Sequence, residues 1–245
     1  MAGHALVVGA TSDIGAAIVR RLVAGGRHVV AWGRSEVRLA SLRDEHTGSV
    51  TTRQVDVTDP GAVAAGLSAI DEAIGSSDPP SGHLAPALDV AVWGAGVFDW
   101  GPADGADPET WAQLLEVNLV AAARWTPQIL RRLRATSATG QPSTLVFVGS
   151  GAAHRVYPDN AAYVASKHGL AALAASTFLD VKRHGIQVSV VSPGLVAAGA
   201  GLWSPQGQDE PTALLQPVDV ADAVGYVVDF PGHGCPVLIE LQPLI

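Results

Sequence analysis

The segment "HALVVGATSDIGAAIVRRLVAGG", residues 4–26, passes from an apolar run through a glycine-rich turn into an amphipathic run. The first run is typical of a buried strand, and the apolar spacing after the turn predicts a helix. Gly9 permits a tight turn, and Gly15 permits close packing of the helix on the strand. Free amide groups at such a helix start can receive a pyrophosphate. We therefore expect the turn to bind a dinucleotide through Gly9, Thr11, Ser12, Asp13, Ile14 and Gly15.

The rest of the chain repeats this alternation of strand-like and helix-like runs. The further strand candidates are "HVVAW", "VTTRQV", "ALDVAVWG", "STLVFVG", "IQVSVVS" and "CPVLIEL". Nearly continuous apolar strands separated by helix-length stretches are typical of a parallel sheet covered on both faces. We predict an α/β fold in which residues 1–245 form one domain. Its Rossmann-type, doubly wound parallel sheet has about seven strands, with helices on both faces.

Two segments outside this alternation have different predicted roles. The Pro/Ser/Gly-rich stretch 75–86 lies between a helix and a strand of the same sheet, so it is interpreted as a surface loop and not a domain linker. The segment 192–216 is too long for an ordinary strand-to-helix connection. Because it follows the carboxyl end of a strand, where open α/β sheets bind ligands, it is predicted to be a substrate lid.

Composition excludes several classes of function. The net charge of −8 argues against a nucleic-acid or anionic-membrane partner. The basic cluster Arg131, Arg132 and Arg134 is interpreted as a solvated helix end. One cysteine, Cys235, excludes an internal disulfide and a cysteine-based metal site, and the scattered histidines predict no metal site either. With no apolar run of membrane-spanning length, we expect a soluble, cytoplasmic protein.

The ends of the second and third strands bear on the choice of cofactor. In "AWGRS", Gly33 stands where an acidic residue would bind the ribose 2′-hydroxyl of NAD, and Arg34 follows. A guanidinium can hold a 2′-phosphate with two hydrogen bonds, which favours NADP (NADPH) over NAD. The alternative for Arg34 is a surface residue that opens the next helix. Asp56, followed by Val57, is predicted to accept a hydrogen bond from the adenine amino group or to cap the next helix.

The helix predicted over 161–176, "AAYVASKHGLAALAAS", carries one tyrosine and one lysine among small residues. Tyr163 and Lys167 are four residues apart, so both side chains leave the same helix face. A cation one turn away stabilises a phenolate and eases proton exchange by the hydroxyl. The alternative is a buried aromatic residue beside a lysine that reaches to solvent.

Taken together, these motifs resemble the short-chain dehydrogenase/reductase family, from Leu6 to about Asp222. The resemblance is carried by "GATSDIG", "DV" at 56–57, "WGAG" at 93–96, "VNL" at 117–119, Ser150, "YVASK" at 163–167 and "SPG" at 192–194. The sequence departs from the family pattern at three places. In the turn, Val8 and Asp13 replace an opening threonine and a middle glycine. Trp93 and Gly94 replace two asparagines, and the threonine that often follows Pro-Gly is missing.

The resemblance implies an NADP(H)-dependent, ketoreductase-like enzyme that interconverts a ketone or aldehyde and an alcohol by hydride transfer. It assigns Tyr163 as general acid in reduction and base in oxidation, with Lys167 holding the nicotinamide ribose. Ser150 would polarise the substrate oxygen, and Asn118, midway along the preceding long helix, would anchor a relay water. The remaining cofactor contacts that it implies are Gly94, Ala95, Gly96, Pro193, Gly194 and the backbone near Val196.

Large side chains are expected around the substrate. Trp100 and Leu202 should rim the pocket, and the residues predicted to bind substrate are Ser150, His154, Tyr157 and Trp203. Three large aromatics favour an apolar or ring-containing substrate, although ordinary lid packing is an equal alternative.

Two other functions stay open. The chain could be a lyase or epimerase that uses the cofactor transiently, or a dinucleotide-binding sensor without turnover. A methyltransferase is disfavoured because it would need an acid at Gly33 and has no use for the Tyr163–Lys167 pair.

The run "GLAALAAS" at 169–176 is small and apolar around most of the helix circumference. A sheet covers only one face of such a helix, so the other face should meet a partner. The family resemblance implies the same, so we predict a homodimer or homotetramer with Ala172 or Ala175 near a two-fold axis.

Overall fold

The computed structural model describes residues 3–75 and 88–244. Its sheet has seven parallel strands in the order β3-β2-β1-β4-β5-β6-β7, which confirms the predicted fold class. The strands are β1 His4–Val8, β2 His28–Gly33, β3 Val50–Gln54, β4 Leu88–Trp93, β5 Ser143–Val148, β6 Ile186–Pro193 and β7 Leu238–Leu241. The predicted 75–86 loop lies outside the described residues, apart from Gly75 at its start.

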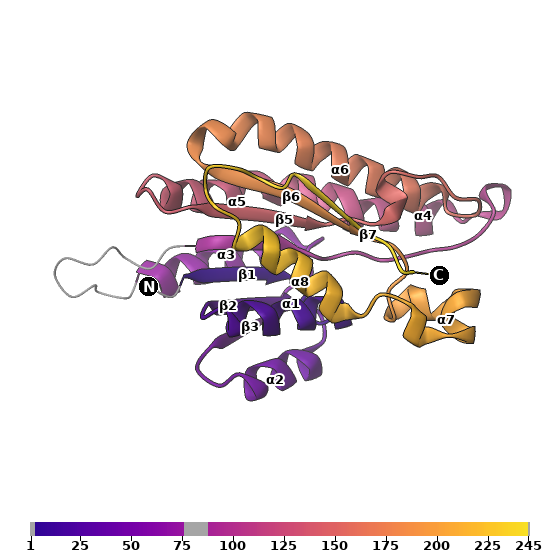
Figure 1. Ribbon diagram of the computed structural model, residues 1–245, viewed down its shortest axis with the longest axis horizontal. Coiled ribbons are helices and arrows are strands. Elements are labelled where there is room, and N and C mark those ends of the chain that lie inside the picture. The colour runs from indigo at the N-terminus through magenta and orange to yellow at the C-terminus, as the bar shows by residue number, and fades with distance from the viewer. Residues whose placement is uncertain (1–2, 76–87, 245) are drawn as a thin grey trace.

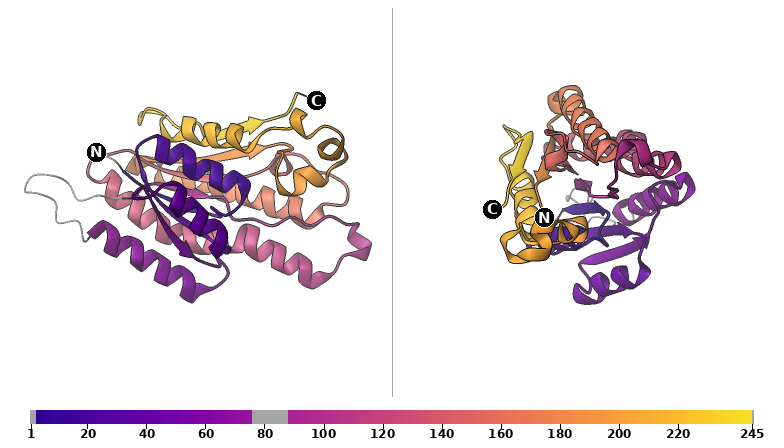
Figure 2. Two further views of the ribbon diagram at one scale, coloured as in Figure 1. Left: turned by 90° about the horizontal axis from the view of Figure 1, so that it is seen from below. Right: turned by 90° about the vertical axis from the view of Figure 1, so that its right-hand side faces the viewer.

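Helices cover both faces of the sheet, as Figures 1 and 2 show. Helices α1, α2 and α8 pack on one face, and α3, α5 and α6 pack on the other. The helices are α1 Asp13–Ala24, α2 Glu36–Glu45, α3 Pro60–Gly75, α4 Pro108–Leu115, α5 Ala121–Ser137, α6 Ala161–Val181, α7 Pro205–Asp209 and α8 Pro217–Val228. Each face of the sheet therefore has its own apolar core.

Strand β1 shows why the strands are apolar at nearly every position. Leu6 and Val8 pack into the core beneath α3, α5 and α6, whereas Ala5 and Val7 pack beneath α1 and α8. Successive side chains of a strand point to opposite faces, and both faces are buried here. Because all strands are parallel, their carboxyl ends meet at one edge, where Figure 1 places α7 and the C-terminus.

The run of helix that carries Asn118 is not a regular α-helix. A π-helical turn, Glu116–Val120, separates α4 from α5, and Asn118 lies inside it. The extra residue in such a turn re-aims the side chains around it, and π turns occur frequently at functional sites. Asn118 was predicted midway along one long helix, and nothing in the spacing of apolar residues indicated this interruption.

Segment 192–216, predicted to be a substrate lid, contains short helical pieces: after β6 it forms the 3-10 turn Gly199–Trp203, then α7, then the 3-10 turn Pro211–Ala213. One sequence interpretation of the basic cluster needs correction. Arg132 is not solvated at a helix end, because its Nε donates to Asp71 Oδ1 of α3 at 2.7 Å. Its side chain is held between two helices that only the fold brings together.

None of the helices within residues 3–75 and 88–244 is long and apolar enough to cross a membrane.

Candidate active site

The glycine-rich turn is held in one conformation by its own backbone and by Ser12. Gly9 has φ +85°, and an added Cβ would lie 2.7 Å from the backbone of Gly94 and Ala95. A Cβ on Gly15 would lie 2.2 Å from the Gly9 carbonyl oxygen. Ser12 Oγ accepts from Gly15 N at 2.9 Å and donates to Gly9 O at 3.0 Å. Side chains at either glycine would therefore displace the turn from the strand ends.

This turn forms one wall of a cleft at the carboxyl edge of the sheet. The cleft is lined by Gly9, Thr11, Ser12, Gly33, Arg34, Val55, Asp56, Val57, Gly94, Ala95, Gly96 and Val117. Most of these were predicted to contact the cofactor, and Gly33, Val55 and Val117 are additions. The open glycines and the start of α1 give a cradle without side chains, which fits the pyrophosphate of a dinucleotide.

Gly33 has a steric reason to be glycine. A Cβ there would lie 2.4 Å from Thr11 Cγ2, so the Thr11 side chain leaves no room for a larger residue at this position. Arg34 follows with its side chain exposed at the cleft, and its carbonyl oxygen accepts from Gln54 Nε2 at 2.9 Å. Helix α2 is capped by Ser35, whose Oγ accepts from Arg38 N at 3.4 Å, so Arg34 precedes the cap.

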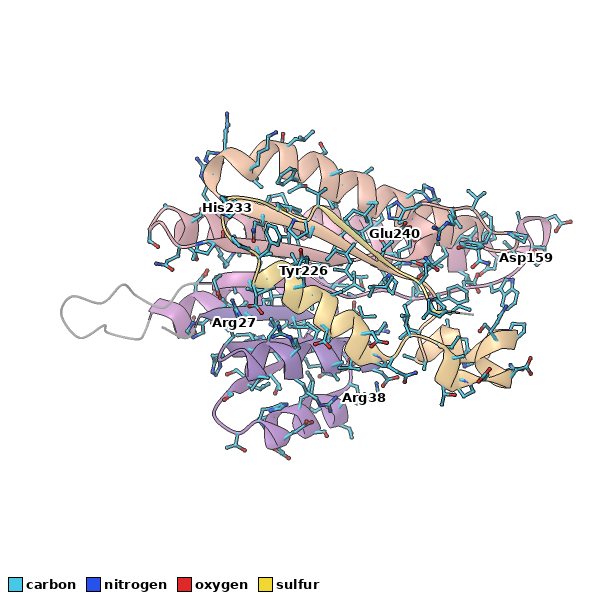
Figure 3. The ribbon with its side chains drawn as sticks, viewed as in Figure 1. Arg27, Arg38, Asp159, Tyr226, His233 and Glu240 are labelled. Carbon is cyan, nitrogen blue, oxygen red and sulfur yellow. The ribbon has the colours of Figure 1, made fainter. Side chains whose placement is uncertain are left out.

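Asp13, the departure in the middle of the glycine turn, is paired with a cation. Arg38 Nη2 donates to Asp13 Oδ1 at 2.9 Å, and Arg38 Nη1 donates to the Thr11 carbonyl oxygen. Figure 3 shows Arg38 on the side of the molecule formed by α1 and α2. The aspartate therefore brings little net negative charge to the cofactor cleft. Arg38 was not predicted as a site residue from the sequence, although it lies only four residues after Arg34.

Asp56 lies in the cleft as an ionised carboxylate. Its Oδ1 accepts from Thr58 N at 2.9 Å and from Thr58 Oγ1 at 2.7 Å. These bonds, first from the backbone and then from the hydroxyl, lower the pKa of Asp56, and the charge of Arg34 adds to the effect. The alternative role as helix cap belongs to Asp59, whose Oδ1 accepts from Gly61 N at 2.7 Å at the start of α3.

Tyr163 and Lys167 leave the same face of α6, towards the carboxyl end of the sheet. The Tyr163 ring packs edge-on against Phe98, with ring centroids 4.9 Å apart. Lys167 is only 5% exposed, and its Nζ lies 5.6 Å from the Tyr163 ring centroid and 3.3 Å from the carbonyl oxygen of Val148. A Cβ on Gly96 would lie 3.6 Å from Lys167 Nζ, so the ammonium borders the cofactor cleft.

Asn118 ties the cleft wall to α6. It is fully buried, its Oδ1 accepts from Val97 N at 2.7 Å, and its Nδ2 donates to Val97 O at 2.9 Å and to Ser166 Oγ at 3.1 Å. Ser166 Oγ in turn donates to the carbonyl oxygen of Tyr163 at 2.7 Å. This chain of bonds holds the helix turn that carries the tyrosine. A relay water at Asn118 stays a prediction.

Ser150 follows β5 and begins the 3-10 turn Gly151–Ala153. Its Oγ accepts from Ala152 N at 3.1 Å, which leaves the hydroxyl proton available to a substrate oxygen. The turn packs against α6, and its far end is tied to β6 because His154 Nε2 lies 3.1 Å from Ser192 Oγ. We call residues 150–154 the serine loop. His154, predicted to bind substrate, thus uses one ring nitrogen to hold this loop against β6.

The Pro193–Gly194 turn meets the last strand at the same edge. Gly194 N donates to Leu241 O at 2.8 Å. The two ends of the 192–216 segment are joined, because Val196 pairs with Leu215 in a parallel bridge. Val196, predicted to contact the cofactor through its backbone, is itself buried and is not among the cleft-lining residues.

The structure leaves the large side chains predicted around the substrate open to solvent. The exposed fractions are 56% for Trp100, 47% for Tyr157, 39% for Leu202 and 65% for Trp203. Trp203 ends a 3-10 turn of the 192–216 segment, and Tyr157 follows the serine loop. Gly101 N donates to Asp159 O at 2.9 Å, so the loop after Phe98 is fastened to the loop before α6. Figure 3 shows Asp159 at the carboxyl-end side of the sheet.

Residues 3–209 match the family model described as short chain dehydrogenase. Two proteins with sequences similar to this chain are described here. The NADP-dependent 3-hydroxy acid dehydrogenase YdfG of Salmonella typhi is 29% identical, over 98% of this chain and 94% of that protein. The granaticin polyketide synthase putative ketoacyl reductase 1 of Streptomyces violaceoruber is 31% identical, over 81% of this chain and 73% of that protein.

Solved structures show the same similarity in three dimensions. A metagenomic short-chain oxidoreductase in complex with NADP superposes with a TM-score of 0.80 at 27% sequence identity. The match covers 99% of this chain and 97% of that chain. The likeness therefore extends over the whole fold, including the carboxyl edge of the sheet that carries the site.

Proposed function

The chain belongs to the short-chain dehydrogenase family of NAD(P)-dependent oxidoreductases, and from this premise we propose that it reduces a ketone or aldehyde with NADPH. The observation that carries the proposal is the placement of Lys167. Its buried ammonium lies beside the Tyr163 ring on one side and beside Gly96 of the cleft on the other. One cation can thus act on the proton donor and on the cofactor.

Each residue of the site has a proposed part in the reaction. The bound nicotinamide supplies a hydride, and the protein must supply a proton to the carbonyl oxygen. Ser150 donates a hydrogen bond to that oxygen, and Tyr163 delivers the proton. Lys167 stabilises the phenolate that remains and holds the ribose hydroxyls, while Asn118 and Ser166 fix the helix turn that carries Tyr163.

The direct test is to incubate the purified protein with NADPH and a panel of ketones and aldehydes. We expect NADPH to be consumed in proportion to the alcohol formed. Cofactor that is bound but neither consumed nor released would instead indicate the sensor, or the lyase or epimerase that uses the cofactor transiently.

The preference for NADP over NAD rests on the side chains at the end of β2. Thr11 leaves no room for a residue larger than Gly33, and Arg34 lies exposed at the cleft. Because Arg38 is engaged by Asp13, Arg34 is proposed as the main partner of the 2′-phosphate. Asp56 is proposed to accept from the adenine amino group.

Arg34→Ala is expected to weaken NADPH binding by about tenfold or more, because a charge-assisted bidentate contact contributes roughly 1.5–3 kcal/mol. NADH binding should hardly change. Dissociation constants for both cofactors, measured by titration calorimetry, check this. The matched control is Arg43→Ala on the exposed side of α2, whose guanidinium lies 3.5 Å from the Asp44 carboxylate. Equal losses for NADPH and NADH would show that Arg34 has a structural role only.

We also propose that the 192–216 segment is a substrate lid. Its base is closed by the Val196–Leu215 bridge, so the 3-10 turn with Trp203 and helix α7 can act as one flap over the carboxyl edge. Trp203 and Trp100 would then contact an apolar part of the substrate, which accounts for their exposure.

A homodimer or homotetramer is proposed from the outer face of α6. An exposed stripe of mostly small residues runs along this helix: Ala161, Ala165, His168, Ala172, Ala175 and Leu179. Small side chains let two helices approach closely around a two-fold axis. The stripe faces away from the sheet, so covering it would not disturb the catalytic side chains.

Ala172→Glu is expected to shift the protein to monomers at micromolar concentration, because the interface would bury an unpaired carboxylate. Sedimentation velocity measures the change in mass. Ala65→Glu, on the exposed side of α3, is the matched control and should keep the wild-type mass. A wild-type protein that sediments as a monomer would contradict the proposal.

A further inference from the structure

The C-terminal tail brings a polar side chain to the serine loop. Gly194 N donates to Leu241 O, so the residue that follows β7 lies beside the Pro193–Gly194 turn. A Cβ on Gly194 would lie 2.7 Å from Gln242 Oε1 and 3.1 Å from Pro243 Cδ. Gln242 and Pro243 thus pack directly on this glycine, which fixes the direction of the Gln242 side chain.

The amide of Gln242 reaches the residue next to Ser150. A Cβ on Gly151 would lie 3.6 Å from Gln242 Nε2, 3.6 Å from Tyr157 Oη and 3.9 Å from Pro193 O. The space that a side chain at position 151 would fill is therefore faced by an amide and a phenol. Gln242 is exposed and Tyr157 is 47% exposed, so the amide and the hydroxyl are both open to a ligand and can donate to it.

The arginine and glutamate nearest in sequence to Gly151 and Gln242 form an ion pair with each other. Arg155 Nη2 lies 3.7 Å from Glu240 Oε1, two residues before Gln242. Figure 3 shows Glu240 on β7, the strand that leads into the tail. His154 is turned to Ser192. The groups facing Gly151 are thus uncharged donors, which suit a neutral acceptor oxygen better than a carboxylate.

We infer that Gln242 and Tyr157 form a polar subsite that recognises a neutral acceptor oxygen, such as an ester or amide carbonyl, on the substrate. This inference rests on the proposed carbonyl reduction, because Ser150 would hold the reacting oxygen beside the same glycine. The second oxygen would lie on the substituent of the reacting carbonyl. The substrate class is therefore a keto ester or keto amide, and the large exposed side chains cover its apolar end.

The test compares three substrates with wild type and variants: ethyl acetoacetate, free acetoacetate, and a plain methyl ketone with as many heavy atoms as the ester. We expect the wild type to have its highest kcat/KM on the ester. In Gln242→Leu and in Tyr157→Phe, the ester-to-ketone ratio of kcat/KM should fall by about fivefold, as expected for one lost hydrogen bond worth about 1 kcal/mol. The loss should lie mainly in KM.

Tyr226→Phe is the matched control and should keep the wild-type ratio, because Tyr226 is exposed on α8 and packs edge-on against Phe230. An unchanged ratio in both Gln242→Leu and Tyr157→Phe would overturn the subsite. A wild-type preference for free acetoacetate over the ester would overturn its neutral character. If the wild type reduces none of the three, nor any other carbonyl compound, the proposed function itself fails, which is a separate result.

Discussion

Tyr163→Phe is expected to lower kcat for carbonyl reduction by about 100- to 1,000-fold, because it removes the proton donor and almost no volume. The edge-on packing of the Tyr163 ring on Phe98 is kept by a phenylalanine, so α6 should stay in place. The affinity for NADPH should therefore remain nearly that of the wild type. Steady-state kinetics and a calorimetric NADPH titration on the same sample measure both quantities.

The chain offers a matched control for this variant. It has three tyrosines, and Tyr226 lies more than half exposed on α8. Tyr226→Phe should keep full activity. If Tyr163→Phe retains more than about a tenth of wild-type turnover, another group delivers the proton and the assignment is wrong.

Lys167→Met is expected to lower kcat by about 100-fold or more and also to weaken NADPH binding by roughly tenfold, because one ammonium serves both the tyrosine and the ribose. Methionine has a similar length but no charge, and it loses the 3.3 Å contact with Val148 O. Replacing a buried charge by an apolar side chain is often neutral or stabilising for the fold. The thermal unfolding midpoint should therefore not fall, which separates lost chemistry from lost structure.

Lys182→Met is the control, since Lys182 is the other lysine of the chain. It lies at the end of α6, with its Nζ 5.8 Å from the Phe178 ring centroid. This variant should keep wild-type kinetics and cofactor affinity. A Lys167→Met enzyme with normal NADPH affinity but low kcat would limit the lysine to the proton transfer.

Much of the fold and the site could be predicted from local sequence signals. The period of apolar residues distinguishes strands from helices, and nearly continuous apolar strands imply a sheet buried on both faces. Gly9 supplies the positive φ of the turn, and Gly15 allows close approach to the Gly9 carbonyl oxygen, both within a few residues of each other. Tyr163 and Lys167 lie one helical turn apart whatever the rest of the chain does. These features depend on residues close together in sequence, so the sequence by itself determined them.

Other features were decided only when distant segments met. The sequence placed Asp13 in the dinucleotide-binding turn, and only the position of α2 beside α1 brings Arg38 to it. Phe98 reaches Tyr163, and Gln242 reaches Gly151, because parallel strands end at one edge of the sheet. No spacing in the sequence encodes these contacts, since they depend on strand order, on register and on where each connection crosses. Local periodicity therefore determined the elements and the catalytic pair, whereas tertiary packing decided what surrounds that pair.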